Sequence, residues 1–156
     1  MRAQGGFSYV VVMFLVAVSA VVAVRALEDT LMTERRNKEA ELLWRGMAYR
    51  KAIAQYYQNS PGAAKGYPAE LANLLHDTRL VRPTRPLRKL YLDPMTEAEW
   101  VVLRDESGAA IGVRSTSQVR PIKQAGFPPE LQHFTHAQRY SDWTFVFKPQ
   151  QPTAQE

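Results

Sequence analysis

One uncharged apolar segment dominates the chain. It comprises the 18 residues from Phe7 to Val24 and lies between Arg2 and Arg25. A helix of this length spans about 27 Å, which is close to the hydrocarbon thickness of a bilayer. A helix also satisfies each backbone amide internally, as lipid requires. The segment therefore predicts a membrane-inserting N-terminal helix, and it leaves less apolar sequence for the core of the remaining chain.

The charge and cysteine content exclude several classes of protein. The chain has 156 residues and a net charge of +5. Eight Lys/Arg stand against five Asp/Glu in residues 1–59, and twelve stand against ten in residues 60–156. Such interspersed charge is typical of a solvated surface rather than of a nucleic-acid footprint. The absence of cysteine excludes a disulfide framework and thiol chemistry.

The apolar segment has three interpretations. The first is a permanent signal anchor that begins at Met1. The second is a cleavable secretory signal peptide with Val24-Arg25-Ala26 as a weak cleavage site, although the apolar run exceeds the usual 7–15 residues. The third is a short hydrophilic leader that ends in glycine and is cut just before the apolar block.

The residues fit the third interpretation best. The run Gly5-Gly6-Phe7-Ser8-Tyr9-Val10 resembles a prepilin peptidase site, and the chain is similar to type IV pilin-like proteins and type II secretion system pseudopilins. The resemblance implies a leader of residues 1–6, cleavage after Gly6 and N-methylation of Phe7. It also implies a helix of residues 7–24 that first anchors the protein in membrane lipid and later lies in the core of a filament.

One position departs from the family pattern. Most members carry a glutamate at the fifth residue of the processed chain, which is Val11 here. In the family that carboxylate is thought to pair with the N-terminal amine of a neighbouring subunit, and a buried amine without a partner is costly. Val11 therefore favours a minor or atypical subunit, such as one at a filament tip.

The charges on either side of the apolar segment predict a membrane orientation opposite to the one that the resemblance implies. Arg2 is alone on the N-terminal side, whereas four cations follow the segment: Arg25, Arg35, Arg36 and Lys38. The positive-inside rule would keep the C-terminal part in the cytoplasm. The resemblance implies a single-pass protein of the bacterial inner membrane with its C-terminal domain in the periplasm.

Residues 25–59 predict a continuation of the same helix. Gly46 is the one potential breaker before Asn59-Ser60-Pro61-Gly62, which ends a helix by a missing donor and backbone freedom. A partial apolar stripe includes Leu27, Leu31, Leu42, Leu43, Met47, Tyr49, Ile53 and Tyr57. The polar stretch 33–41 predicts a solvated or subunit-facing neck. A helix over residues 7–58 would be about 75 Å long.

Residues 60–148 predict a small α+β domain. A short helix would start at Tyr67-Pro68, with Leu71, Leu74 and Leu75 on one face, and Asp93-Pro94 would form a turn. Three strands are expected at residues 100–103, 110–115 and 143–147, the first two joined by a turn at 105–108. The predicted fold is a long N-terminal transmembrane helix packed on a domain with a three-stranded antiparallel sheet, followed by a disordered tail at 149–156. This order resembles the pseudopilin fold. Residues 116–142 show no match to it, and because only Asp142 stands near the family's calcium loop, no calcium site is carried over.

No set of residues predicts catalysis or a cofactor. His133 and His136 lie three apart, with His76 and Asp142 elsewhere, and do not complete a zinc ligand set. The run 115–117 is interpreted as the end of a strand, and Glu97 and Glu99 as a solvated turn. We therefore expect no enzymatic activity, metal, cofactor or small-molecule substrate. The aromatic residues are interpreted as core rather than as a platform for stacking bases.

The expected function is structural. The chain would be a pseudopilin subunit that assists protein secretion in a short periplasmic filament, with prepilin peptidase, other pseudopilin subunits and an inner-membrane assembly platform as partners. The alternatives are a membrane-anchored interaction domain that retains Met1, a secreted α+β domain that begins at Leu27, and a minor pilin that binds DNA.

Overall fold

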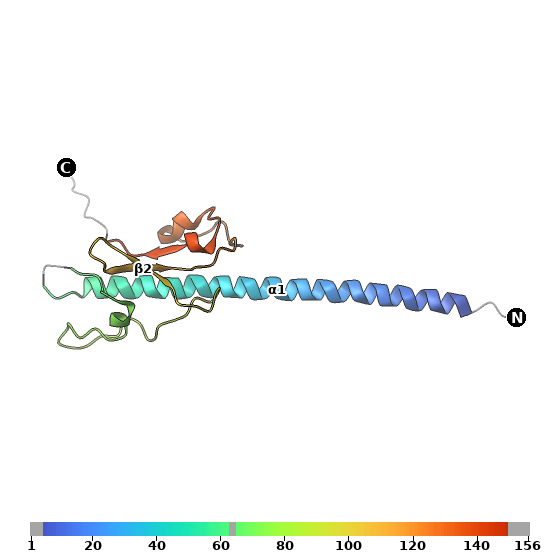
Figure 1. The fold of residues 1–156 in the computed structure, drawn as a ribbon, viewed down its shortest axis with the longest axis horizontal. Helices are drawn as coiled ribbons and strands as arrows, with labels where there is room; N and C mark the ends of the chain where they lie inside the picture. The colour runs from blue at the N-terminus through green and yellow to red at the C-terminus, as the bar shows by residue number, and fades with distance from the viewer. Residues whose placement is uncertain (1–4, 63–64, 150–156) are drawn as a thin grey trace. The chain divides into compact units, whose positions relative to one another are not determined.

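The structure, a computed structural model, describes residues 5–62 and 65–149, with side chains from Ser8 onward. The predicted leader residues 1–4 and tail residues 150–156 lie outside the described part. Two compact units divide the chain, Met1–Asn37 and Lys38–Glu156. The elements follow the predicted order (Figure 1) and are α1 (Gly5–Gln58), η1 (Leu71–Leu74), β1 (Val101–Arg104), β2 (Ala110–Arg114), η2 (Pro129–Phe134), η3 (Tyr140–Asp142) and β3 (Thr144–Val146).

Helix α1 runs for 54 residues without interruption, which corresponds to about 80 Å. It starts at Gly5, two residues before the predicted start, and ends where predicted. Proline is absent from the helix and first follows it at Pro61. Hydroxyl groups in the exposed part of the helix bond back to carbonyls one turn earlier, as Thr30 does to Ala26 at 2.9 Å. Such bonds satisfy the side chains without breaking the helix.

In the C-terminal unit, one face of α1 is buried under the small domain. The buried positions recur every three or four residues, as expected for one face of a helix, and are Glu39, Leu42, Gly46, Tyr49, Ala52, Ile53 and Tyr56. Of the predicted stripe, Leu42, Tyr49 and Ile53 are buried against the domain, whereas Leu27 and Leu31 precede this part and are 61% and 58% exposed.

The three strands form one antiparallel sheet in the order β1-β2-β3, which confirms the predicted sheet. The tight turn between β1 and β2 is built by Asp105, whose Oδ1 accepts hydrogen bonds from the N–H groups of Ser107 and Ala109. Gly108 has a φ of 82°, a conformation that glycine adopts without strain. Figure 1 shows the sheet lying along the C-terminal part of α1.

The sheet and the segment between β2 and β3 surround an aromatic core. The rings of Phe134 and Trp143 stack with a centroid distance of 5.2 Å and an interplanar angle of 5°. Phe145 packs edge-on against Phe134 and Trp100. Each aromatic side chain of this cluster is at least nine-tenths buried, so the interpretation of Trp100 and Trp143 as core residues is confirmed.

One local prediction needs correction. The predicted short α-helix is a single 3₁₀ turn, η1, that starts at Leu71. Pro68 precedes the turn instead of opening it, because its carbonyl is used to accept the N–H of Ala110 at the start of β2. Only Leu74 of the predicted apolar face is buried. Residues 116–142, which show no match to the pseudopilin pattern, contain η2 and η3. The N–H groups of Tyr140 and Ser141 donate hydrogen bonds to the carbonyls of Val119 and Ser117.

Candidate assembly helix and its supporting contacts

The N-terminal unit presents apolar side chains on every side of α1. From Ser8 to Glu34 each described side chain is exposed. The large apolar ones are 39–68% exposed and comprise Tyr9, Val10, Val11, Val12, Met13, Phe14, Leu15, Val16, Val18, Val21, Val22, Val24, Leu27, Leu31 and Met32. A helix that is apolar all round is stable in lipid or among other helices, not in water. Among the described residues, α1 contains the one span long and apolar enough to cross a membrane, with a mean hydropathy of 2.7.

The predicted processing and assembly residues all lie within α1. Gly6 and Phe7 follow the helix start at Gly5, and their side chains are not among those the structure describes. Val11 is 39% exposed and Val24 is 57% exposed. No charged residue occurs between Ser8 and Val24, so the apolar surface of the helix is continuous there.

Glu39 supplies a contact that the sequence did not indicate. It is the first buried residue of α1, and it is 6% exposed. Its carboxylate accepts hydrogen bonds from the N–H groups of Ile122 at 2.7 Å and Lys123 at 3.1 Å, and from the Tyr140 hydroxyl at 2.7 Å. A buried carboxylate is tolerated only with such partners. The stretch 33–41 is therefore not wholly solvated, because Glu39 joins α1 to the 116–142 segment.

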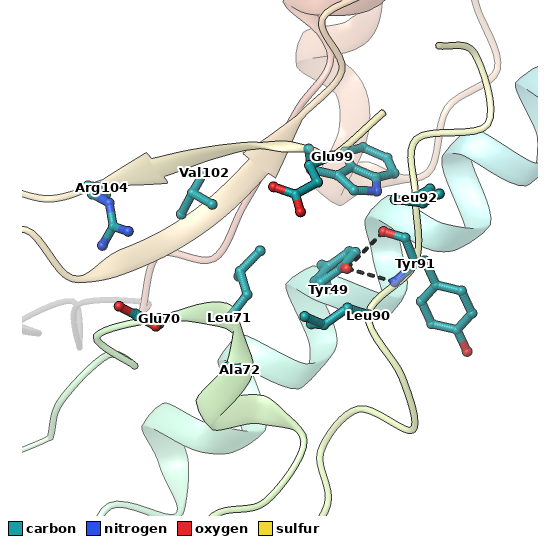
Figure 2. A pocket seen from close by; sticks show the side chains of 11 residues that line it. Tyr49, Glu70, Leu71, Ala72, Leu90, Tyr91, Leu92, Glu99, Val102 and Arg104 are labelled. Atoms are coloured by element: carbon teal, nitrogen blue, oxygen red, sulfur yellow. Dashed lines mark hydrogen bonds between the residues drawn. The ribbon is translucent and has the colours of Figure 1, made fainter. Parts of the chain in front are cut away.

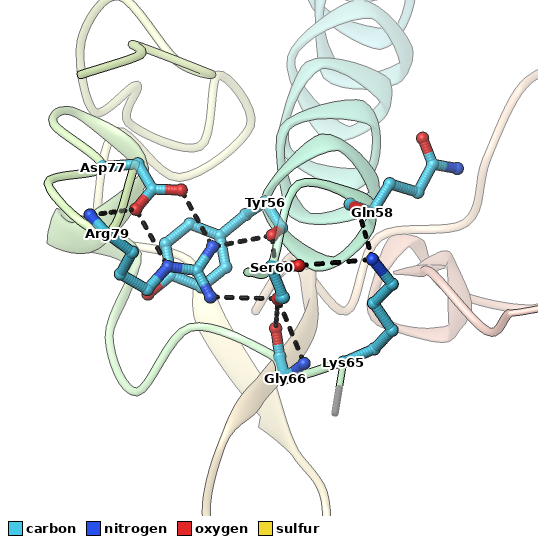
Figure 3. Close-up of polar contacts among 7 residues, drawn as sticks. All are labelled: Tyr56, Gln58, Ser60, Lys65, Gly66, Asp77 and Arg79. Atoms are coloured by element: carbon cyan, nitrogen blue, oxygen red, sulfur yellow. Dashed lines mark hydrogen bonds and ion pairs between the residues drawn. The ribbon is translucent and has the colours of Figure 1, made fainter. Parts of the chain in front are cut away.

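A second polar cluster holds the C-terminal end of α1 (Figure 3). Arg79 donates to the carbonyl of Tyr56 at 2.7 Å, to Ser60 Oγ at 3.0 Å and to both carboxylate oxygens of Asp77. Its guanidinium also lies 3.4 Å from the centroid of the Tyr56 ring. Lys65 donates to the carbonyls of Gln58 and Ser60. Cations that bind the last carbonyls of a helix satisfy groups that have no partner within it.

The charge state of this cluster follows from its geometry. Hydrogen bonds from the Arg79 side chain hold the pKa of the Asp77 carboxyl below its ordinary value of 3.8, and burial opposes that shift only in part. The same pairing raises the pKa of Arg79. Asp77 is therefore ionised at neutral pH, and its negative charge holds Arg79 against the end of the helix.

The candidate catalytic and metal-binding residues do not form a common site, and several of them make structural hydrogen bonds. His133 Nε2 lies 3.1 Å from the Thr144 carbonyl oxygen, and His136 adopts a φ of 62° in a turn. No group of three His, Cys, Asp or Glu side chains within the described residues could hold a metal ion. Ser115 is buried and donates to Asp93 Oδ2 at 2.6 Å. Glu97 is exposed and lies 3.5 Å from Lys38.

The loop after Asp77 carries a cluster of cations. Residues 79–89 contain no acid and five bases, Arg79, Arg82, Arg85, Arg88 and Lys89. Arg79 is held by its ion pair with Asp77 at the C-terminal end of α1. Val81, in the same loop, is fully exposed. The cluster can be recognised in the sequence by the local density of basic residues. The net charge of each half of the chain does not reveal it, because acidic residues elsewhere in the same half balance these bases.

The comparisons with known proteins give no relative for this chain. No family model, no curated protein and no solved structure matches it. The architecture is that of a long N-terminal apolar helix joined to a small three-stranded antiparallel sheet, which is compatible with a pilin-like protein.

Proposed function

We propose that this chain is a structural pseudopilin-like subunit of a type II secretion or type IV pilus-like machine, of the minor or atypical kind. The observation that carries the proposal is the surface of α1. Its residues 8–34 are exposed and largely apolar, and the same unbroken helix continues to Gln58 with one face in the core of a small domain. Such a helix requires lipid or other helices around its first half, and it is anchored to a folded unit by its second half.

In the proposed mechanism, prepilin peptidase removes residues 1–6 and leaves Phe7 as the N-terminus. The apolar helix then holds the subunit in the inner membrane, with the domain in the periplasm. An assembly platform moves the helix out of lipid into a bundle of like helices. Apolar burial and close helix packing favour that bundle once lipid no longer surrounds the helix.

The contacts of α1 support a mechanical role. A force applied to the N-terminal half of an uninterrupted helix would be resisted by the bonds that hold its other half in the domain. Glu39 forms one set of these bonds, and the Arg79 cluster forms another at the opposite end of the packed part. Both sets join α1 to segments distant in sequence, so they resist withdrawal of the helix from the domain.

The experiment is intact-mass analysis and N-terminal sequencing of the protein purified from membranes of its native host. We expect an N-terminus at methylated Phe7 and full-length protein when the peptidase is deleted. Gly6→Val should block cleavage, and the matched variant Gly5→Ala should not. An N-terminus at Met1 would contradict the proposal and leave an anchored interaction domain. An N-terminus at Leu27 would indicate a secreted protein.

A further inference from the structure

The two edges of the sheet differ in how their outward backbone groups are used. Along β3 the N–H of Phe147 bonds to the carbonyl of Ile111 in β2, and pairing alternates along an antiparallel strand. The carbonyls of Thr144 and Val146 therefore point away from the sheet. Both receive side-chain donors, from His133 Nε2 at 3.1 Å and from Arg50 Nε at 3.0 Å. The edge at β3 is closed by the protein itself.

The edge at β1 is open in its middle. The same alternation places Val101 and Leu103 against β2, through Arg114 and Gly112, and directs the N–H and C=O of Val102 outward. Within the described residues these two groups have no hydrogen-bond partner. At the end of β1, the side chain of Arg104 donates to the carbonyl of Ala69 at 2.8 Å, which joins this end of the strand to the segment before η1.

A pocket of about 290 Å³ lies directly against this open edge (Figure 2). Its lining includes Val102 and Trp100 from the strand side, and Leu71, Leu90 and Tyr49 opposite. Tyr49 is fixed there, because its hydroxyl accepts the N–H of Tyr91 at 2.9 Å and donates to the carbonyl of Tyr91 at 3.0 Å. The volume is just below the range for small-molecule sites, so the pocket suits one or two side chains of a larger partner.

The polar groups of the pocket indicate what would enter it. Glu70 and Glu99 are exposed carboxylates in the lining, and the one cation there, Arg104, already donates to the carbonyls of Ala69 and Gly108. Trp100 is 6% exposed, and its Nε1–H donor has no acceptor within the described residues. The pocket therefore combines apolar walls with two exposed carboxylates, which fits a long aliphatic side chain with a cationic end.

We propose that the β1 edge and this pocket form a binding site for an extended peptide segment of a partner protein that carries a lysine or arginine. The segment would add as a strand beside Val102, since strand addition uses backbone bonds for affinity and pockets at alternate residues for specificity. Its basic side chain would lie along Leu71 and Leu90 and end between Glu70 and Glu99. The site lies wholly in the C-terminal unit, so it does not depend on whether α1 assembles into a filament.

The experiment follows amide and indole signals of the ¹⁵N-labelled full-length chain in detergent micelles by NMR. The probe is the blocked peptide Thr-Val-Lys-Val-Thr at millimolar concentration. We expect shifts at the Val102 amide and at the Trp100 indole. Two matched peptides, one with Glu in place of Lys and one N-methylated at the backbone nitrogens of Lys and the following Val, should produce neither shift.

Variants of the protein separate the site from general association. Glu70→Gln and Glu99→Gln change exposed residues, and together they should weaken binding by about three- to tenfold at low salt. Glu106→Gln, on the exposed turn outside the pocket, should leave binding unchanged. The proposal is overturned if Val102 does not shift, if the Glu or N-methylated peptide binds equally, or if Val102 shifts with protein concentration alone, which would identify a second copy as the occupant.

Discussion

Gly46 of α1 lies directly beneath the ring of Phe145 in β3, so closely that a Cβ at position 46 would overlap the ring carbons. Phe145 is fully buried and is held between Trp100 and Phe134. The ring is therefore packed between these two side chains and α1. The absence of a side chain at one helix position is what allows the sheet to approach α1.

Gly46→Ala should destabilise the domain, although alanine is the better helix former by about 1 kcal/mol. Overpacking a filled core costs about 1–3 kcal/mol, and the overlap with Phe145 is severe, so we expect a net loss of about 1–2 kcal/mol. The measurement is denaturant unfolding of the full chain in micelles, followed by tryptophan fluorescence. All three tryptophans, Trp44, Trp100 and Trp143, lie in the C-terminal unit.

Gly66→Ala is the matched control for this prediction. A Cβ at Gly66 would meet no atom within 4 Å, and its φ is not in the left-handed region. The control should leave stability unchanged or slightly raised. Equal stability of the Gly46→Ala protein and the wild type would show that Phe145 can move aside.

Glu39→Gln should cost about 1.5–3 kcal/mol of unfolding free energy. The carboxylate accepts from two backbone N–H groups and from the Tyr140 hydroxyl, and bonds to a charged group are the stronger kind. In glutamine the side-chain NH₂ would replace one of the two accepting oxygens and would face one of these N–H or O–H donors. Glu41→Gln is the control, because Glu41 is exposed and its pair with Arg45 is a surface contact worth at most about 1 kcal/mol. Similar losses in the two variants would contradict the role assigned to Glu39.

The long helix and the strands could be predicted because their signals are local. Helix α1 has no proline, and the predicted strand 143–147 alternates aromatic with smaller side chains. The role of Glu39 could not be predicted in this way. It lies in a polar stretch, and its partners Lys123 and Tyr140 are 84 and 101 residues away. Whether a charged side chain is buried depends on which groups from distant parts of the sequence can hydrogen-bond to it. The local sequence pattern does not show this.

The same limit explains the errors in the domain. Tyr67-Pro68 has the pattern of a helix start, but a long-range bond from Ala110 uses the Pro68 carbonyl. The open edge at Val102 was equally hidden, because the strands were predicted without their order. Which edge is free depends on the positions of Arg50 and His133 relative to β3.

Asp77→Asn should remove part of the pH dependence of stability. The pKa of Asp77 is lowered in the folded protein by Arg79, so its contribution is present above the ordinary value of 3.8 and is lost as pH falls through the lower folded pKa. The wild type should exceed the variant in unfolding free energy at pH 7, and the difference should shrink below about pH 4. Taking the difference cancels the contribution of Asp105, whose pKa is also lowered, first by its bond from Ser107. A constant difference from pH 7 to pH 3 would argue against the assignment.

A single cysteine can report the orientation of the domain, since the chain has none of its own. Glu106→Cys places a thiol on the exposed turn between β1 and β2. In cells with a permeabilised outer membrane, a membrane-impermeant maleimide should label this thiol, because the proposed function puts the domain in the periplasm. Tyr9→Cys, within the apolar surface of α1, should remain unlabelled until detergent is added. Labelling of Glu106→Cys only after lysis would favour the orientation given by the positive-inside rule.

Val11→Glu should increase self-association of the chain in membranes. The wild-type helix has no carboxylate between Ser8 and Val24, so nothing on this part of the helix can pair with the N-terminal amine of a neighbouring copy. A glutamate at this position would supply that partner, and pairing offsets the cost of a buried amine that would otherwise be left without a partner. The measurement is the yield of cross-linked dimer through a cysteine placed at Val16, with and without Val11→Glu. Val12→Glu is the control, because it adds the same charge one residue along, on a different side of the helix. If both variants cross-link equally, the charge itself is responsible; if neither exceeds the parent, the residue at position 11 does not limit assembly and the case for a tip subunit is lost.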